Sequence, residues 1–362
     1  MNKNCRKTAL IDITDLYHPY QDPGDNFDLI MAYALSEIDL KAVILDCTNK
    51  YRQPIAEHRI PEFADKNGPR DPGIIPVMQL NYLFGKNIPF GVSPFTPMRF
   101  PEDRMLDVPA FQQKGIELII QILKTAPERV DIATYSSVRA LAAAYNREPE
   151  LFHEKVAGIH ISAGASSPDF LEWNVELDQN AFVCLLRSNL PIAIYPCATK
   201  NGPFDLGQYN SFWELKDLSF IKQMDKNLKR YLWFAFERIS RIDFLRAMDE
   251  DVSESMMRSI YQRSHNVWET AVWMELSQRK LVRRADGKYR IVPKEQIEKS
   301  DLVFRSELLP CKIEVRDNGL FEFELTDSVT NFKIYHRDNP KEHELALQEA
   351  LPDIYTSFVL QR

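Results

Sequence analysis

The chain alternates short apolar runs with helical patterns, and this alternation restricts the folds that it can adopt. Apolar runs such as "KTALIDITD", "LKAVILDCTN" and "RVDIATYSS" each end in polar residues, with amphipathic segments such as "FDLIMAYALSE" between them. Strands that alternate with helices form parallel sheets covered by helices. We therefore expect an α/β protein with a mainly parallel, Rossmann-like open sheet flanked by helices. Ligands of such sheets bind beyond the carboxyl ends of the strands, so the polar residues after each run should line one rim.

The second half of the chain departs from this alternation. Two amphipathic segments, 228–248 and 256–281, predict long added helices, and "RKLVRR" at 279–284 predicts a solvated helix end. "CKIEVRDNGLFEFELTD" predicts a C-terminal hairpin, because Asn-Gly between alternating strands is a strong turn signal. The Pro-rich segment 86–109 predicts a long loop. Since no Gly/Ser-rich linker interrupts the chain, we expect residues 1–362 to form one domain.

Composition narrows the classes of partner and the compartment. A net charge of −7 argues against nucleic acid or an anionic membrane as a partner. The chain shows neither a signal-peptide pattern nor the roughly 18 consecutive apolar residues of a spanning helix. Its five cysteines have no C-x-x-C spacing, which fits a reducing compartment better than a disulfide framework. We expect a cytoplasmic protein.

An acidic segment, "YHPYQDPGDNFDLIMAYAL" at residues 17–35, is the strongest local signal. Asp22, Asp25, Asn26 and Asp28 crowd the start of an apolar helix. Asp and Asn are good helix caps, and carboxylates favour the positive end of a helix, so capping explains one or two of them. A divalent cation with oxygen ligands explains all four. The EF-hand spacing is absent, and the residues alone leave both readings open.

Five segments resemble, in order, the motifs of the inosine/uridine-type nucleoside hydrolases. "DPGDNFDLIMAYAL" is similar to their Asp-Pro-Gly-x-Asp-Asp-Ala-x-Ala-Leu signature, and "ILDCTN" to their Asn after the second strand. "DIATYSSVRALAAAYNREPELFHEKVAGIHISAGA" resembles their Thr-Gly-x-x-Thr-Asn strand and helix. "EWNVELDQNAFVCLLRSNLPIAIYP" resembles their Glu-Phe-Asn-x-x-x-Asp-Pro-x-Ala-Ala segment and is the most specific match. "VWETAVWMELSQRKL" resembles their His-Asp or Trp-Asp helix start. The resemblance covers about residues 8 to 283.

The resemblance implies the nucleoside hydrolase fold, one bound Ca²⁺ and hydrolysis of the N-glycosidic bond of ribonucleosides. Breaking this bond builds positive charge on the sugar, which an electron-rich site with a carboxylate base stabilises. By position, Asp22 would be a metal ligand and the general base, and Asp28 the second carboxylate ligand. Thr134 would bind the metal through its backbone carbonyl, and Glu269 stands at the family's last Asp ligand. The implied sugar contacts are Asn26, Asn49, Glu172 and Asn174. Trp268 is a candidate to stack on the leaving base, although aromatic residues at helical spacing usually belong to the core.

Departures from the family pattern leave alternatives open. Asp22 to Asp28 spans six positions instead of five, and "LYHPYQ" lengthens the approach to the motif. Asp15 is therefore an alternative to Asp22 as the first metal ligand. Asp25 is a further alternative ligand or, like Asn26, the contact to the ribose diol.

The leaving-group end of the implied site departs further. Trp268 stands where the inosine/uridine type has the His that protonates the base, Val138-Arg139 replace Thr-Asn, and the family's His-Gly segment is missing. His18 in the added loop and His265, on the predicted helix before Glu269, are candidate acids, although an exposed or structural His is the commoner case.

The resulting hypothesis is a hydrolase that cleaves the N-glycosidic bond of a ribonucleoside or related N-riboside with a Ca²⁺-bound water. The alternative is a non-catalytic Ca²⁺- and sugar-binding relative. In either case the expected ligand is a small nucleoside or riboside. The resemblance further implies a role in purine or pyrimidine salvage and a homodimer or homotetramer.

Overall fold

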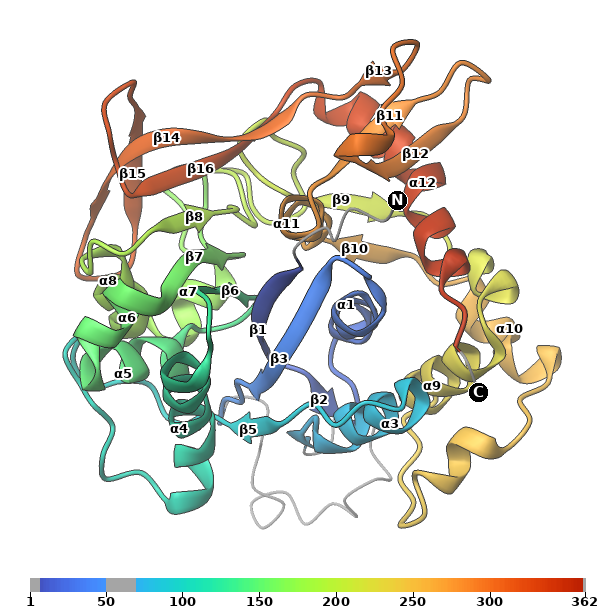
Figure 1. Cartoon of the computed structure of the whole chain (residues 1–362), viewed down its shortest axis with the longest axis horizontal. Coiled ribbons are helices and arrows are strands. Elements are labelled where there is room, and N and C mark those ends of the chain that lie inside the picture. The colour runs from blue at the N-terminus through green and yellow to red at the C-terminus, as the bar shows by residue number, and fades with distance from the viewer. Residues whose placement is uncertain (1–6, 50–69, 361–362) are drawn as a thin grey trace.

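The computed structural model describes residues 7–49 and 70–360, and its described part is built around a nine-stranded sheet (Figure 1). From edge to edge the strands are β15 (Phe321–Leu325), β14 (Ser306–Val315), β16 (Phe332–Arg337), β8 (Ile192–Ile194), β7 (Val156–Ile161), β6 (Val130–Thr134), β1 (Thr8–Thr14), β3 (Ile38–Leu45) and β5 (Phe90–Val92). The strands from β16 to β5 run parallel, and β14 and β15 are antiparallel additions at one edge. The predicted, mainly parallel open sheet is confirmed.

Helices cover both faces of this sheet. They are α1 (Pro23–Ala34), α3 (Ile74–Phe84), α4 (Ala110–Thr125), α5 (Arg139–Arg147), α6 (Pro149–Lys155), α7 (Trp173–Leu177), α8 (Gln179–Leu186), α9 (Lys226–Phe236), α10 (Glu254–Tyr261), α11 (Thr270–Leu276) and α12 (Pro340–Ser357). Short 3₁₀ turns are η1 (Ser219–Gln223), η2 (Arg246–Asp249) and η3 (Lys294–Gln296). Minor strands are β2 (Tyr17–His18), β4 (Asp71–Pro72), β9 (Trp213–Leu215), β10 (His265–Val267), β11 (Arg279–Arg283), β12 (Tyr289–Pro293) and β13 (Leu302–Val303).

The period of two along each strand divides the interior into two cores. Leu10 of β1 faces one core and its neighbour Ile11 faces the other, as expected for a strand buried on both faces. The first core contains α1, α9 and α12, and the second contains α4, α5 and α8. Figure 1 shows α1, β1 and β3 at the centre, with α4 and α5 on one side and α9 and α10 on the other. This arrangement encloses the start of α1, where the acidic segment lies.

The prediction of two long helices after residue 207 is wrong. In the first segment, α9 ends at Phe236, because Arg238 adopts a left-handed φ of 54° that closes the helix. The second segment forms α10, β10, α11 and β11 in succession. Residues 265–267 pair with β9 and residues 279–283 pair with β12, so tertiary strand pairing overrides the helical periodicity. The "RKLVRR" segment is therefore mainly a strand and not a helix end.

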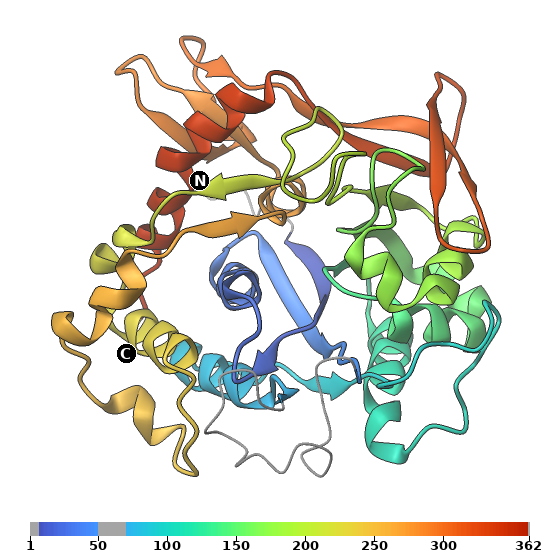
Figure 2. The same ribbon diagram turned by 180° about the vertical axis from the view of Figure 1, so that it is seen from behind.

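The C-terminal hairpin follows the prediction. β14 and β15 pair antiparallel from Cys311↔Leu325 to Val315↔Phe321, around a turn in which Gly319 has a φ of 81°. α12 closes the chain and packs against the first core. In both views the hairpin lies across the molecule from α10 (Figure 2). In residues 7–49 and 70–360, none of the helices combines the length and apolarity needed to cross a membrane.

Candidate functional site

Polar residues follow the strands of the central sheet and gather at its carboxyl rim. The ladder continues past the ends of the strands. The N–H of Asp46 donates to the Thr14 carbonyl at 2.8 Å, that of Tyr135 to Ile13 at 3.0 Å, and that of Ser162 to Thr134 at 2.9 Å. Residues just beyond β1, β3, β6 and β7 are thus held at fixed positions side by side.

Six carboxylates collect at the β1 end of this rim, and we call them the acidic cluster: Asp12, Asp15, Asp22, Asp25, Asp28 and Glu269. Asp22 caps α1 by accepting the Gly24 N–H at 2.7 Å, which places Asp25 and Asp28 in the first turns of that helix. Asp12, Asp15, Asp25 and Asp28 are at most 7% exposed. In the described residues, no ion pair from Lys, Arg or His reaches the cluster. One carboxylate caps α1, as the capping reading predicted, and the others exceed what capping needs.

Burial and mutual repulsion raise the pKa values of these carboxyl groups. Burial raises the pKa of Asp12 to about 7 and, together with the charges of Asp46 and Asp22, that of Asp15 to about 8. Burial, with the charge of Asp22 adding to it, raises the pKa of Glu269 to about 7. The pKa values of Asp25 and Asp28 are raised well above the ordinary value by burial and then by neighbouring carboxylates. A cluster of this kind binds protons or a cation readily.

Several buried oxygen atoms of this region have no hydrogen-bond partner. They are both carboxylate oxygens of Asp12, Oδ2 of Asp25, Oγ1 of Thr134 and the hydroxyl of Tyr135. Leaving buried polar atoms unpaired costs about 1–3 kcal/mol each. Hard oxygen donors of this type are the ligands that Ca²⁺ takes, so the residues fit that cation. In the part of the chain that the structure describes, however, no three His, Cys, Asp or Glu side chains form a metal-ligand set by themselves.

The expected metal ligands already hold defined contacts. Asp28 Oδ1 accepts the Trp273 Nε1–H at 3.1 Å, and Glu269 Oε2 accepts the Trp268 backbone N–H at 2.9 Å. The Thr134 carbonyl accepts the Ser162 N–H and has a second lone pair free. A pocket of about 10 Å³, lined by Asp28, Glu269 and His265 among others, is large enough for one water molecule or ion.

Glu172 and Asn174, the expected sugar contacts, stand at the start of α7 on the same rim. Glu172 caps this helix and accepts the Gly164 N–H at 2.8 Å and the Asn174 N–H at 3.0 Å. Burial nevertheless raises its pKa to about 7. The Asn174 side-chain amide donates to the carbonyls of Ser162 at 3.0 Å and Tyr135 at 3.3 Å. Both side chains are therefore fixed by the backbone before any ligand arrives.

The remaining expected contacts are more dispersed. Asn26 is fully buried, and its Oδ1 accepts the hydroxyl of Tyr231 from α9 at 2.9 Å. Asn49 is exposed, with its backbone N–H bonded to the Phe95 carbonyl at 3.1 Å. Trp268 is half-buried, donates from Nε1 to the Cys197 carbonyl at 2.9 Å, and packs against Phe212 and the exposed Phe204.

The two candidate acids occupy different environments. His265 lies on β10 and not on a helix, and it stacks on Phe27 of α1 at 5.6 Å. A Cβ atom on Gly24 would lie 3.3 Å from His265 Cε1 and 3.0 Å from Asp22 Oδ1, so this imidazole borders the acidic cluster. His18 stacks on Phe234 of α9 at 5.6 Å. Burial lowers the pKa of both imidazoles, which keeps them neutral at pH 7.

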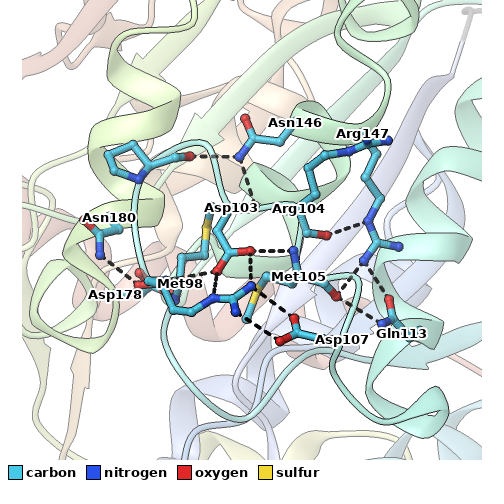
Figure 3. A network of polar contacts seen from close by, with 12 residues as sticks. Met98, Asp103, Arg104, Met105, Asp107, Gln113, Asn146, Arg147, Asp178 and Asn180 are labelled. Atoms are coloured by element: carbon cyan, nitrogen blue, oxygen red, sulfur yellow. Dashed lines mark hydrogen bonds and ion pairs between the residues drawn. The ribbon is translucent and has the colours of Figure 1, made fainter.

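The Pro-rich segment is an ordered loop apart from β5, and Figure 3 shows how it is held. Within the loop, Arg99 forms ion pairs with Asp103 at 2.7 Å and Asp107 at 3.0 Å. Side chains of α5 and α8 bind its backbone: Asn146 to Pro101 and Asp103, Arg147 to Arg104 and Met105, and Asn180 to Met98. The loop that replaces the family's His-Gly segment is therefore fixed from outside the site.

Three structurally central residues were missed from the sequence. Asp12 carries a carboxylate inside an otherwise apolar strand, and that placement was itself a signal, since buried unpaired Asp is rare. Tyr135 stands at the Gly position of the resembled Thr-Gly motif and is 5% exposed. Arg139, at the Asn position, is fully buried and pairs with Asp178 at 2.7 Å. It also donates to the carbonyls of Cys47, Pro94 and Leu177.

Comparison with solved structures identifies the architecture. A plant nucleoside hydrolase matches with a TM-score of 0.54 at 14% identity, over 94% of this chain and 98% of its own. The purine-preferring ribonucleoside hydrolase from Gardnerella vaginalis matches with a TM-score of 0.52 at 14% identity, over 96% and 99%. The effector protein XOO4466 matches with a TM-score of 0.51 at 13% identity, over 98% and 95%. No protein-family model and no curated protein sequence matches the chain. The chain has the nucleoside hydrolase fold, as its sequence motifs predicted.

Proposed function

We propose that this protein is a hydrolase of N-ribosyl bonds that binds one Ca²⁺ at the acidic cluster. The observation that carries the proposal is that six carboxylates converge at the carboxyl rim of a nucleoside hydrolase fold. Four of them are almost fully buried, and in the described residues none is paired with a cationic side chain. A buried group of like charges needs protons or a cation to balance it.

The chemistry follows from the charges around the site. Asp15 or Asp22, Asp28, Glu269 and the Thr134 carbonyl would hold Ca²⁺, which when bound orients a water molecule and the ribose hydroxyls. The carboxylates of the cluster stabilise the positive charge that builds on the sugar as the C–N bond breaks. The Asp22 carboxylate, half-buried at the start of α1, accepts the proton from the attacking water.

The leaving base lies toward Trp268 in this proposal. Its indole is fixed by the bond to Cys197 and by packing on Phe212, so its half-buried face is ready to contact a planar ring. His265 borders Asp22, and we therefore place it as the acid candidate ahead of His18. Asn26 and Asn49 remain predictions for sugar contact.

A second candidate function is a non-catalytic protein that binds Ca²⁺ and a riboside. The specific observation in its favour is the missing leaving-group acid, since Trp268 stands where the resembled motif has its His. Both candidate imidazoles, His18 and His265, also have lowered pKa values and are poor proton donors at pH 7. A weak general acid limits turnover of natural nucleosides more than it limits binding.

A reducing-sugar assay separates the two. The full chain is incubated with a panel of nucleosides and with p-nitrophenyl riboside, with Ca²⁺ or with a chelator, beside Asp28→Asn and a distant Asp251→Asn control. Asp251 is fully exposed and lies outside the site. The p-nitrophenyl group leaves without an acid, so its hydrolysis tests the carboxylates alone.

Turnover that chelator and Asp28→Asn abolish, but Asp251→Asn does not, supports the hydrolase. Ca²⁺ and riboside binding without turnover of any substrate selects the binding protein instead. Absence of Ca²⁺ binding refutes both.

We further propose that residues 1–362 form one domain, because the C-terminal strands continue the same sheet as β1. We also propose that the ligand is a small nucleoside or riboside.

A further inference from the structure

We propose that the hydroxyl of Tyr135 is an additional oxygen ligand of the cation bound at the acidic cluster. This inference rests on the proposed function, because it assumes that the cluster binds Ca²⁺. It concerns a residue particular to this chain, since Tyr135 stands at the glycine position of the resembled motif, where no side chain exists to reach the metal.

The placement of the ring carries the first step. The Tyr135 ring stacks on the Trp273 indole, with centroids 5.9 Å apart and an interplanar angle of 29°. Trp273 Nε1 in turn donates to Asp28 Oδ1 at 3.1 Å, so the stacked pair lies directly against a predicted metal ligand. The charges that act on the Tyr135 hydroxyl are, in order, those of Asp28, Asp12 and Glu269. The Tyr135 ring therefore lies beside the acidic cluster.

The state of the hydroxyl carries the second step. Tyr135 is 5% exposed, and its buried hydroxyl has no hydrogen-bond partner. Two oxygen atoms that bind the same Ca²⁺ at 2.3–2.6 Å are about 3–5 Å from each other, and this separation is mostly longer than a hydrogen bond. Unpaired oxygens near one another are thus the arrangement expected around an ion. In the described residues the Asp and Glu side chains do not form a ligand set by themselves. A cation bound there would need further oxygen donors, and this hydroxyl is one.

The backbone carries the third step. The Tyr135 N–H donates to the Ile13 carbonyl at 3.0 Å, and its carbonyl accepts the Asn174 amide at 3.3 Å. Its neighbour Thr134 is itself a predicted ligand through the carbonyl. The main chain at this point is held on both sides, so the phenol is pre-organised and loses little conformational entropy when it binds an ion.

The experiment is calorimetric titration of the chelator-treated full chain with Ca²⁺ alone. Wild type is compared with Tyr135→Phe, which keeps the stacked ring and removes only the oxygen, and with Tyr145→Phe. Tyr145 is the matched control because it lies on α5 and its hydroxyl donates to the Ser188 carbonyl at 3.3 Å, away from the cluster. Thermal unfolding in chelator verifies that each variant is folded, and near-ultraviolet circular dichroism records the Tyr135–Trp273 pair as Ca²⁺ is added.

We expect Tyr135→Phe to raise the Kd for Ca²⁺ on the order of tenfold, the size typical of losing a supporting group at a metal site. Tyr145→Phe should leave it unchanged, and the Ca²⁺-induced dichroism change should shrink only in Tyr135→Phe. A Kd for Tyr135→Phe within about twofold of wild type, with the same dichroism change, refutes the inference and leaves the proposed function intact. Failure of wild type to bind Ca²⁺ refutes the proposed cation site and the inference with it.

Discussion

Replacing Asp12 by Asn should stabilise the metal-free protein, and by more at high pH than at low pH. Asp12 is fully buried in β1 with neither carboxylate oxygen paired, and its pKa is raised from 3.8 to about 7. Between these values the folded chain keeps a proton that the unfolded chain releases. Stability from this group is therefore fully present below pH 4 and is lost as the pH rises through 7. Asn has no proton to lose, so the variant escapes this loss.

The size of the effect follows from the shift. Three pKa units correspond to about 4 kcal/mol in total at 1.36 kcal/mol each, and about 2–3 kcal/mol of this falls between pH 5 and pH 8. For a chain of this length that difference is about 3 °C in Tm. Thermal unfolding in chelator at both pH values measures it, with the exposed Asp251→Asn as the control that should show no trend. A gap between Asp12→Asn and wild type that is constant with pH, or reversed at pH 8, would refute the reasoning.

Three other changes test separate parts of the structure. Arg139→Met should cost about 3–5 kcal/mol of unfolding free energy in urea, because it leaves Asp178 buried without its partner, whereas Arg187→Met at the exposed hairpin pair should cost under about 1 kcal/mol. Gly319→Ala should lower the free energy of unfolding by about 1–3 kcal/mol, since φ is 81° and the new Cβ would lie 2.6 Å from a Val175 methyl. Gly85→Ala, with φ 59° and open space around the new Cβ, should lower it by only about 1 kcal/mol. Equal losses in the two variants would contradict this. The affinity for Ca²⁺ should rise between pH 5 and pH 8, because the raised pKa values of the acidic cluster require protons to leave before the cation binds, and a flat calorimetric profile would contradict it.

The sheet was predictable because each strand carries its own signal. β1, β3, β6 and β7 are short apolar runs that end in polar residues, and a strand buried on both faces needs that composition wherever it lies in the sheet. The edge hairpin was equally readable, since its turn is set by local residues. These features depend on few contacts outside the segment itself.

The region from 228 to 281 was misread because contacts with distant segments override its helical periodicity. His265 to Val267 form a strand only because β9 lies beside them, and β9 comes about 50 residues earlier. Arg238 ends α9 in a left-handed conformation that its residue type does not announce. Pairing between distant segments decided both outcomes, and a single sequence does not display it.

The site was predictable as a location but not as a set of contacts. The rim follows from strand order, but only the resemblance to nucleoside hydrolase motifs predicted that Asp22, Asp28 and Glu269 lie near one another. That Glu172 serves as a helix cap, or that Asn26 bonds Tyr231, depends on side-chain directions that spacing does not fix.

The acidic cluster persists without a cationic partner because the structure around it prevents relaxation. Phe27, at the start of α1, packs against Tyr355 of α12 at 5.1 Å and against His265 at 5.6 Å, so this turn of helix cannot move away from the rim. On the other side, Arg139 ties three rim backbones together from inside the second core. Carboxylates held in this way repel one another, and this repulsion lowers the free energy of unfolding of the metal-free protein. A bound cation neutralises the carboxylates and removes this destabilisation. As the pH rises, the metal-free protein should therefore lose stability while its affinity for Ca²⁺ increases.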